Sequence, residues 1–176
     1  MRSDRIVIYN TQTGFTKKYA EWLSEALECE CVECSGAEKM DLDRYETIIF
    51  GGWACAGSIS KLKWFQSKMK KWENKKLAVY CVGGSPMENP DVEEARKNCL
   101  SEEEHRKAKI FYCPGGINYE KMPVASKCMM KLFVSALKAK KDKTEKEQMM
   151  ADMISKSYDI SDRKYIEPIV AWAKGE

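Results

Sequence analysis

The chain has 176 residues, of which 44% are hydrophobic and 32% are charged, and its formal net charge is +3. This length suits one domain with a full hydrophobic core, so we expect a single domain over residues 1–176. The small net charge argues against nucleic acid as a partner, and no apolar run approaches the roughly 20 residues that a membrane-spanning helix needs. No targeting segment is recognisable before the first apolar run, which favours a cytoplasmic location.

The first 115 residues alternate between apolar runs and segments of helical periodicity. Strands are expected at residues 6–9, 29–34, 47–51, 77–82 and 109–113. Helical spacing of apolar residues predicts helices over 15–27 and 59–72, and the charged segment 91–100 is compatible with a helix. This alternation predicts an α/β doubly wound fold, with a five-stranded parallel sheet between two helical layers.

Residues 117–160 are too long for an ordinary connection and predict a helical insertion before the last helix. A lysine-rich run at 138–143 and a short helix near Met149–Ile154 belong to it. The last helix is expected from about Asp162, with Ser161 as its N-cap and an interruption at Pro168. One helical face of the insertion is expected to contain Met122, Ala125, Met129, Leu132, Phe133, Ala136 and Leu137.

Eight cysteines occur, and we expect free thiols that pack as small hydrophobic residues. The spacing Cys29-x-Cys31-x-x-Cys34 offers an iron–sulfur or zinc site as an alternative. No fourth ligand lies nearby in sequence, so we predict no metal site. The single histidine, His105, lies in a charged stretch and is expected on the surface rather than as a general base.

Small residues follow four of the expected strands. They are Thr11–Thr16, Gly51–Gly52, Gly83–Gly84 and Gly115–Gly116. Open parallel sheets bind ligands beyond the carboxyl ends of their strands, and small residues let a ligand approach the backbone closely. We therefore expect one shared binding site at this edge of the sheet.

The stretch Thr11-Gln-Thr-Gly-Phe-Thr16 joins the first strand to the first helix and is a candidate phosphate site. A helix N-terminus offers unpaired N–H groups and a partial positive charge, both of which suit a phosphate. The three threonine hydroxyls add donors, and neither GxxxxGK[ST] nor GxGxxG is present. The pattern favours a single phosphate monoester, and the alternative is an ordinary turn capped by a threonine.

This stretch, after the strand-like run Ile6-Val-Ile-Tyr9, resembles the T/S-x-T-G-x-T phosphate loop of flavodoxins, with Phe15 where many flavodoxins have Asn. The resemblance implies strand order 2-1-3-4-5 and FMN as the cofactor. It implies that Trp53 stacks on the isoalloxazine ring and that backbone groups of Val82–Pro86 bond the pyrimidine edge. The alternative for Trp53 is a side chain that packs on the end of the sheet. The implied cofactor-binding residues are Thr11, Gln12, Thr13, Gly14, Phe15, Thr16, Trp53, Ala54, Cys55, Ala56, Gly57, Val82, Gly83, Gly84 and Ser85.

The C-terminal part contains Cys113-Pro-Gly-Gly-Ile-Asn-Tyr119, a Met-rich helix, Tyr158-Asp-Ile-Ser-Asp162 and Trp172. In these features it resembles the branch that contains menaquinone-dependent protoporphyrinogen dehydrogenase. It implies an FMN-dependent oxidoreductase that is quinone-linked or acts on protoporphyrinogen. An electron-transfer flavodoxin with a redox partner protein, and a binding protein that has lost FMN, remain alternatives. The sequence nominates no catalytic acid or base.

Residues 122–143 combine an expected apolar helix face with the lysines of 138–143. Such a segment can lie on an anionic membrane surface or pair with the carboxylates of a porphyrin. The alternative is a solvated lysine face on a packed helix. The expected location is therefore cytoplasmic, with peripheral contact of residues 122–143 with the inner face of the membrane as an additional hypothesis.

Overall fold

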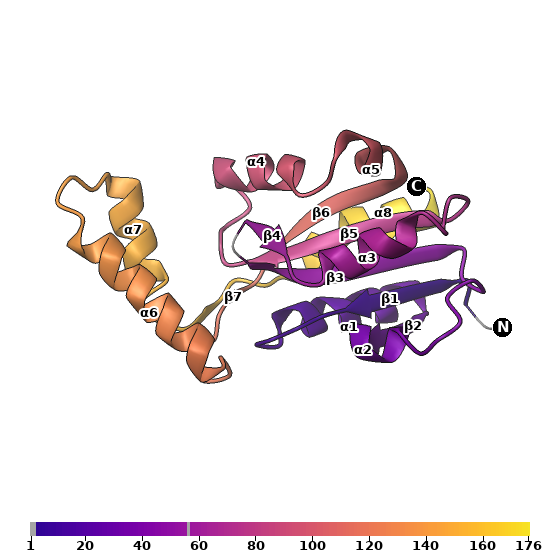
Figure 1. Cartoon of the computed structure of the whole chain (residues 1–176), viewed down its shortest axis with the longest axis horizontal. Helices are drawn as coiled ribbons and strands as arrows, with labels where there is room; N and C mark the ends of the chain where they lie inside the picture. The colour runs from indigo at the N-terminus through magenta and orange to yellow at the C-terminus, as the bar shows by residue number, and fades with distance from the viewer. Residues whose placement is uncertain (1–2, 56) are drawn as a thin grey trace.

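The computed structural model describes residues 3–55 and 57–176. Its main sheet contains five parallel strands in the order β2-β1-β3-β5-β6, which confirms the expected order 2-1-3-4-5. Helices cover both faces, so the expected three-layer α/β fold is confirmed (Figure 1). The strands are β1 Arg5–Tyr9, β2 Glu30–Glu33, β3 Thr47–Cys55, β5 Lys76–Gly83 and β6 Ala108–Pro114.

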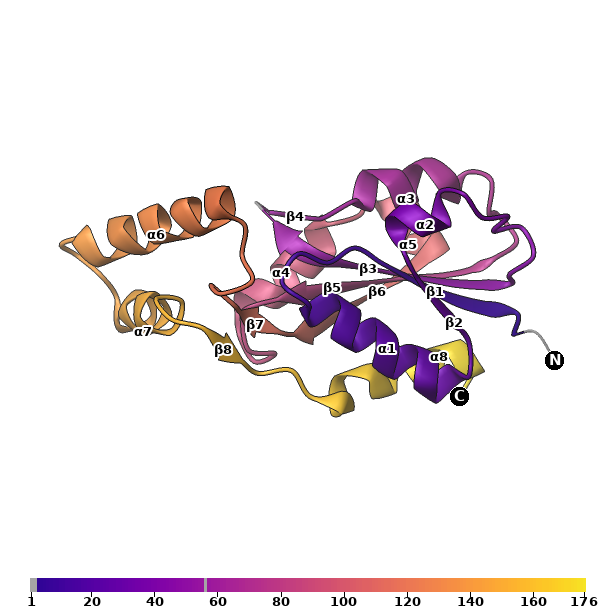
Figure 2. The ribbon, with the colours of Figure 1, turned by 90° about the horizontal axis from the view of Figure 1, so that it is seen from below.

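The two faces of the sheet pack against different helices (Figure 2). On one face α1 (Phe15–Leu27) and α8 (Glu167–Lys174) bury residues such as Tyr19 and Ile169. On the other, α2 (Cys34–Ala37) and α3 (Leu62–Met69) bury residues such as Phe65. The helices α4 (Pro90–Asn98) and α5 (Glu102–Lys107) lie in the connection from β5 to β6.

The central strands are apolar on both sides because both sides are covered. Ile6, Val7 and Ile8 of β1 are all completely buried. Ile6 and Ile8 belong to the cluster under α2 and α3, whereas Val7 belongs to the cluster under α1 and α8. Successive side chains of a strand point to opposite faces, so a continuous apolar run is what a doubly covered strand requires.

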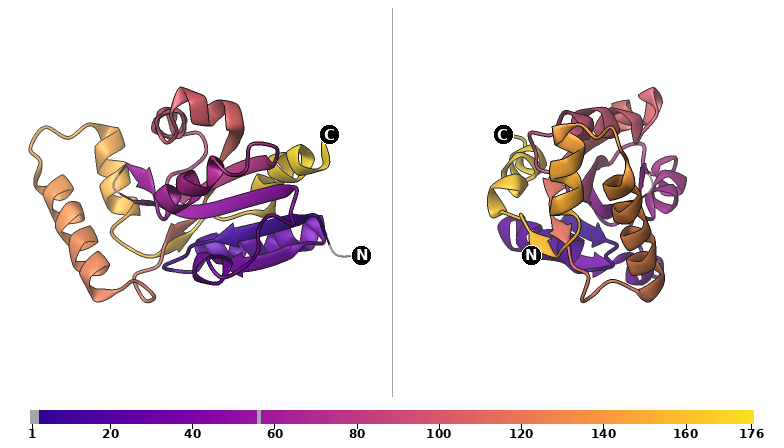
Figure 3. Two further views of the ribbon diagram at one scale, coloured as in Figure 1. Left: turned by 45° about the vertical axis from the view of Figure 1, so that its right-hand side comes forward. Right: turned by 90° about the vertical axis from the view of Figure 1, so that its left-hand side faces the viewer.

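The expected insertion is present beyond the carboxyl ends of the strands (Figures 1 and 3). It comprises β7 (Gly116–Ile117), α6 (Val124–Ala139), α7 (Glu145–Met153) and β8 (Tyr158–Asp159). The strands β7 and β8 pair antiparallel, so the chain leaves and re-enters the domain at one place. A small separate core, which includes Ile117, Tyr119, Val134 and Ile154, joins the two helices to this base.

Helix α6 packs on one side only. Val134 is buried, with Met130 and Leu137 partly buried beside it. Five residues expected together on one helical face are all exposed: Ala125, Met129, Leu132, Phe133 and Ala136. A helix that is apolar around most of its circumference and packs on one side leaves the rest of its apolar surface uncovered.

The last helix begins later than expected. A 3-10 turn (η1, Arg163–Ile166) precedes α8, and the side chain of Asp162 accepts a hydrogen bond of 3.0 Å from the Lys164 N–H. The cap is therefore Asp162, not Ser161. Pro168 lies in the first turn of α8, where its missing N–H costs no helical hydrogen bond.

Candidate functional site

The loop before α1 leaves backbone donors unpaired at the helix N-terminus. Gly14 has a φ of 101° in the left-handed region, and its N–H donates to Oγ1 of Thr11 over 3.1 Å. Within the described residues, the N–H groups of Phe15, Thr16 and Lys17 have no hydrogen-bond partner in the protein. Three free donors at the positive end of a 13-residue helix suit an anion.

The threonines of this loop differ in their access to solvent. Thr13 lines a cavity, whereas Thr16 is only 1% exposed. The carbonyl of Thr16 accepts a hydrogen bond of 3.2 Å from the buried hydroxyl of Tyr80. Among the three threonine hydroxyls expected to hold a phosphate, the one of Thr13 is therefore placed best.

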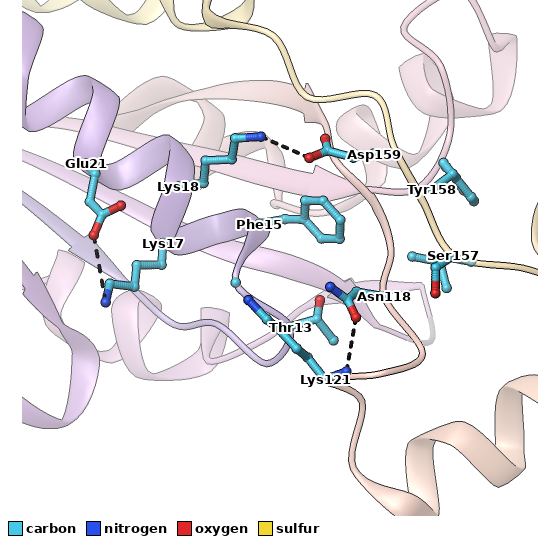
Figure 4. A pocket seen from close by; sticks show the side chains of 12 residues that line it. Thr13, Phe15, Lys17, Lys18, Glu21, Asn118, Lys121, Ser157, Tyr158 and Asp159 are labelled. Carbon is cyan, nitrogen blue, oxygen red and sulfur yellow. Dashed lines mark hydrogen bonds and ion pairs between the residues drawn. The ribbon is translucent and has the colours of Figure 1, made fainter.

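A cavity of about 550 Å³ opens beside this loop, between α1 and the base of the insertion (Figure 4). Residues of the α1 side and of both ends of the insertion contribute to its wall. They are Thr13, Gly14, Phe15, Lys17, Lys18, Glu21, Ile117, Asn118, Lys121, Ser157, Tyr158 and Asp159.

Three lysines reach this cavity, and they differ in their partners. Lys18 pairs with Asp159 at 2.9 Å and also donates to Ser161 Oγ at 2.8 Å. Lys17 is 3.7 Å from Glu21. Lys121 forms no ion pair with any described residue, and its Nζ would lie 4.0 Å from a Cβ placed on Gly14. Lys121 is thus the uncompensated positive charge beside the free N–H groups.

Asp159 keeps its negative charge at neutral pH. Burial by itself would raise the pKa of this carboxyl, but hydrogen bonds from Ser161 and Lys18 outweigh burial and lower the pKa below the ordinary value of 3.8. The charge of Lys18 is therefore neutralised locally, which leaves Lys121 to act on a ligand.

The glycines at the strand ends make room for aromatic side chains of the protein itself. A Cβ on Gly51 would lie 1.9 Å from the ring of Tyr80, and one on Gly83 would lie 2.6 Å from the Tyr112 hydroxyl. A Cβ on Gly84 would lie 2.7 Å from the Tyr158 hydroxyl. These tyrosines occupy the side of each glycine on which a Cβ would stand.

The loop expected to bond the pyrimidine edge has its backbone groups in use. The Tyr112 hydroxyl donates to the Ser85 carbonyl at 2.8 Å and accepts from the Ser85 N–H at 3.1 Å. The Tyr158 hydroxyl donates to the Gly84 carbonyl at 2.7 Å. Burial raises the pKa of Tyr158 to about 12, so this donor keeps its proton. Val82, expected in the same loop, lies in β5 and is 4% exposed.

The other expected flavin loop is a hairpin. Strand β3 continues to Cys55 and pairs antiparallel with β4 (Ser58–Ile59). The Trp53 N–H donates to Ser60 Oγ at 3.1 Å, and the Ser60 N–H donates to the Trp53 carbonyl at 2.9 Å. Ala54, Cys55 and Gly57 are exposed. Ala56, also expected to bind the cofactor, lies outside the described residues.

Other candidate chemistry lies elsewhere. All eight cysteines are free, with Cys55 and Cys128 exposed. The described residues contain no group of three or more His, Cys, Asp or Glu side chains that could hold a metal ion. A ring nitrogen of the half-buried His105 lies 2.9 Å from the backbone oxygen of Lys97, and His105 does not line the cavity beside the phosphate loop.

Comparison with known families decides the class of protein. A family model described as a flavodoxin domain matches residues 6–145, which is most of the chain. The chain belongs to the flavodoxin-domain family. A comparison with curated proteins found no significant match.

Several solved structures resemble this flavodoxin domain. One is a flavodoxin, WrbA-like protein from Agrobacterium tumefaciens, with 16% identity, a TM-score of 0.46 and coverage of 86% of this chain and 96% of that chain. Another is the Trp repressor binding protein from Bacillus subtilis, with 17% identity, a TM-score of 0.46 and coverage of 80% of this chain and 99% of that chain.

The cavity of this flavodoxin domain brings together only part of the residues expected from the sequence. Thr13, Gly14 and Phe15 line it, whereas Trp53 and Ser85 do not. The insertion supplies residues that sequence reasoning missed, above all Lys121 and Tyr158. They reach the site because β7 and β8 pair, and that pairing of two-residue strands leaves no periodic signal in the sequence.

Proposed function

We propose that this flavodoxin-domain protein binds FMN, with the phosphate of FMN at the loop Thr11–Thr16. The observation that supports this is the set of three unpaired N–H groups at Phe15, Thr16 and Lys17, beside the uncompensated Lys121. Thr13 adds a hydroxyl at the cavity wall. A dianionic phosphate monoester satisfies these donors and this charge together.

The residues fit the two ends of FMN unequally. The phosphate end fits, because free donors and a lysine face a cavity. The pyrimidine contacts expected from Gly84 and Ser85 do not fit, because Tyr158 and Tyr112 already bond those backbone groups. We therefore assign no ring contact to them, and Trp53 with the paired strands β3 and β4 stays the proposed wall beside the isoalloxazine ring.

Bound FMN supplies transfer of one or two electrons. The chain's own part in an FMN-dependent oxidoreductase is to hold the phosphate, balance its charge with Lys121 and place the cofactor at the carboxyl edge of the sheet. The tail that resembles the branch of menaquinone-dependent protoporphyrinogen dehydrogenase supports a finer proposal, a quinone or a porphyrinogen as substrate. The helical insertion before the last helix is consistent with that branch.

A titration tests cofactor binding. Purified protein is titrated with FMN and, separately, with riboflavin, while flavin fluorescence and the visible absorbance band are recorded. We expect FMN to bind and riboflavin to bind at least tenfold more weakly, since riboflavin lacks the phosphate. Equal affinity for the two flavins would remove the phosphate loop from the proposal.

A second candidate, a flavodoxin-fold binding protein without FMN, has its own supporting observation. The hydroxyls of Tyr112 and Tyr158 bond backbone groups of Ser85 and Gly84, in the loop that was expected to contact the pyrimidine edge. A protein that binds neither flavin in the titration supports this candidate. If FMN binds, turnover of protoporphyrinogen with a menaquinone analogue supports the enzyme, whereas rapid reduction of a redox protein without such turnover supports an electron-transfer flavodoxin.

A further inference from the structure

Helix α6 presents a continuous exposed apolar surface, which we call the apolar arc. Its larger members are mostly open to solvent: Val124 is 78% exposed, Leu132 71% and Met129 69%. Residues three and four apart share one face of a helix, so these side chains form a stripe rather than scattered points. The apolar arc consists of Val124, Ala125, Cys128, Met129, Leu132, Phe133 and Ala136, all of them exposed.

The fold does not need the apolar arc for its own core. The opposite side of α6, with Val134 buried and Met130 and Leu137 beside it, provides the packing against α7. An exposed stripe of this kind on an otherwise satisfied helix indicates an interaction surface.

The segment that carries the apolar arc is rich in lysine. Residues 121–141 contain six lysines and no Asp or Glu. The whole chain has 30 Lys and Arg against 27 Asp and Glu, so the remaining residues have a net charge of −3. Lys127, Lys131 and Lys138 follow one another four and seven residues apart and therefore lie along one border of the apolar arc.

These lysines are also largely uncompensated. Of the six, Lys140 alone forms an ion pair with a described residue, at 2.6 Å from Glu147. Lys146, outside this group, joins α7 to α4 through Asp91 at 3.1 Å. The positive charge beside the apolar arc is thus available to a negatively charged surface.

We propose that α6 lies on an anionic lipid surface, with the apolar arc in the interfacial region and the bordering lysines at the headgroups. Interfacial helices combine an apolar face with a basic polar face in this way. A second copy of the chain suits the apolar arc less well, because a symmetric contact would bring two lysine borders together without an acidic residue between them. Within the described residues, no helix combines the length and the apolar composition of a membrane span.

The position of the insertion gives this contact a direction. The insertion lies beyond the carboxyl ends of the strands (Figures 1 and 2), the same edge that carries the loop Thr11–Thr16. Contact through α6 therefore places the lipid surface on the side of the proposed FMN phosphate site. The lipid contact itself does not depend on FMN and is tested without it.

Vesicle flotation tests the proposal with the full-length protein. Vesicles of phosphatidylcholine alone are compared with vesicles that also contain phosphatidylglycerol, at low and high salt. We expect the protein to float with the anionic vesicles, and the floated fraction to fall with salt because exposed charges are screened. Absence of flotation with anionic vesicles at low salt would overturn the proposal.

Two variants and two matched controls separate the apolar and charge contributions. M129S/L132S shortens the apolar arc, and K127Q/K131Q/K138Q removes its basic border; each should lower partition onto anionic vesicles roughly tenfold. M87S removes an exposed methionine outside α6, and K63Q/K70Q/K71Q removes exposed lysines in and after α3; both should float like the parent. Circular dichroism checks that each variant is folded.

The same variants distinguish lipid insertion from the two alternatives, which are contact through charge alone and contact with a second copy of the chain. If K127Q/K131Q/K138Q abolishes flotation and M129S/L132S leaves it unchanged, the charges alone bind the vesicles. That result would overturn insertion of the apolar arc into the lipid. If the protein instead shows a dimer by light scattering and no vesicle binding, and the dimer is lost in M129S/L132S, the apolar arc is assigned to a second copy of the chain. Failure of FMN binding alone would leave the flotation result intact, so the two proposals fail separately.

Discussion

The hydroxyl of Tyr158 donates a hydrogen bond of 2.7 Å to the carbonyl oxygen of Gly84, 74 residues earlier in the chain. This bond ties the returning strand of the insertion to the loop after β5. It also occupies a backbone acceptor in the loop that the sequence assigned to the pyrimidine edge of FMN. The hydroxyl of Tyr158 therefore connects the insertion directly to the loop after β5.

Replacing this tyrosine should separate its structural and binding effects. Tyr158→Phe removes one hydrogen bond and should lower the free energy of unfolding by about 1 kcal/mol. Because the Gly84 carbonyl becomes free, FMN should bind about fivefold more tightly, which corresponds to about 1 kcal/mol. Tyr165→Phe is the control, since no hydrogen bond of the Tyr165 hydroxyl occurs among the described residues. Weaker FMN binding in Tyr158→Phe would mean that the hydroxyl contacts the cofactor.

Lys121 should matter for the phosphate and not for the ring. Lys121→Met should weaken FMN binding by about tenfold, since a charge-assisted contact to phosphate is lost, and should leave riboflavin binding unchanged. Fluorescence titrations with both flavins measure this difference. Lys156→Met, an exposed lysine of the insertion outside the cavity, should bind FMN like the parent protein. An equal loss for both flavins would point to a change of shape rather than of charge.

The two threonines that flank Gly14 should behave differently. The sequence assigns a phosphate contact to both, whereas only Thr13 lines the cavity and Thr16 is buried. Thr13→Val should weaken FMN binding by about tenfold, in line with loss of a hydrogen bond to a charged group. Thr16→Val should change FMN affinity little, and isothermal titration calorimetry can compare them. The reverse order would place the phosphate deeper than the cavity.

Acid should weaken the contact between α1 and the insertion. The pKa of Asp159 is lowered below 3.8 in the folded protein. The ionised carboxylate therefore stabilises the fold above about pH 4. This stabilisation is lost as the pH falls through the folded-state pKa. Both side chains of the Lys18–Asp159 pair are substantially exposed, so Asp159→Asn should cost at most about 1 kcal/mol at pH 7. Urea denaturation of parent and variant should converge below pH 3.8. A difference that widens in acid would contradict this assignment.

Much of the fold follows from local patterns that can be read along the chain. The runs around Ile6, Ile48 and Val79 predict strands because a strand covered on both faces must be apolar throughout. The alternation of these runs with helical segments then leaves the doubly wound sheet as the natural arrangement. The position of loop Thr11–Thr16 at the carboxyl edge follows from the same reasoning, as does the presence of a helical insertion.

Which groups stay free at that edge was decided by tertiary structure alone. Gly51 and Gly84 are small residues at strand ends in the sequence, and only the fold places Tyr80 and Tyr158, from distant segments, where a Cβ on these glycines would stand. Lys121 is an ordinary lysine in the sequence and becomes a candidate phosphate ligand only because β7 and β8 pair. Likewise, α6 is apolar around most of its surface, and only the placement of α7 determines which side stays exposed. Periodicity specifies an element and its faces, whereas contacts between distant residues decide which faces and polar groups remain available for function.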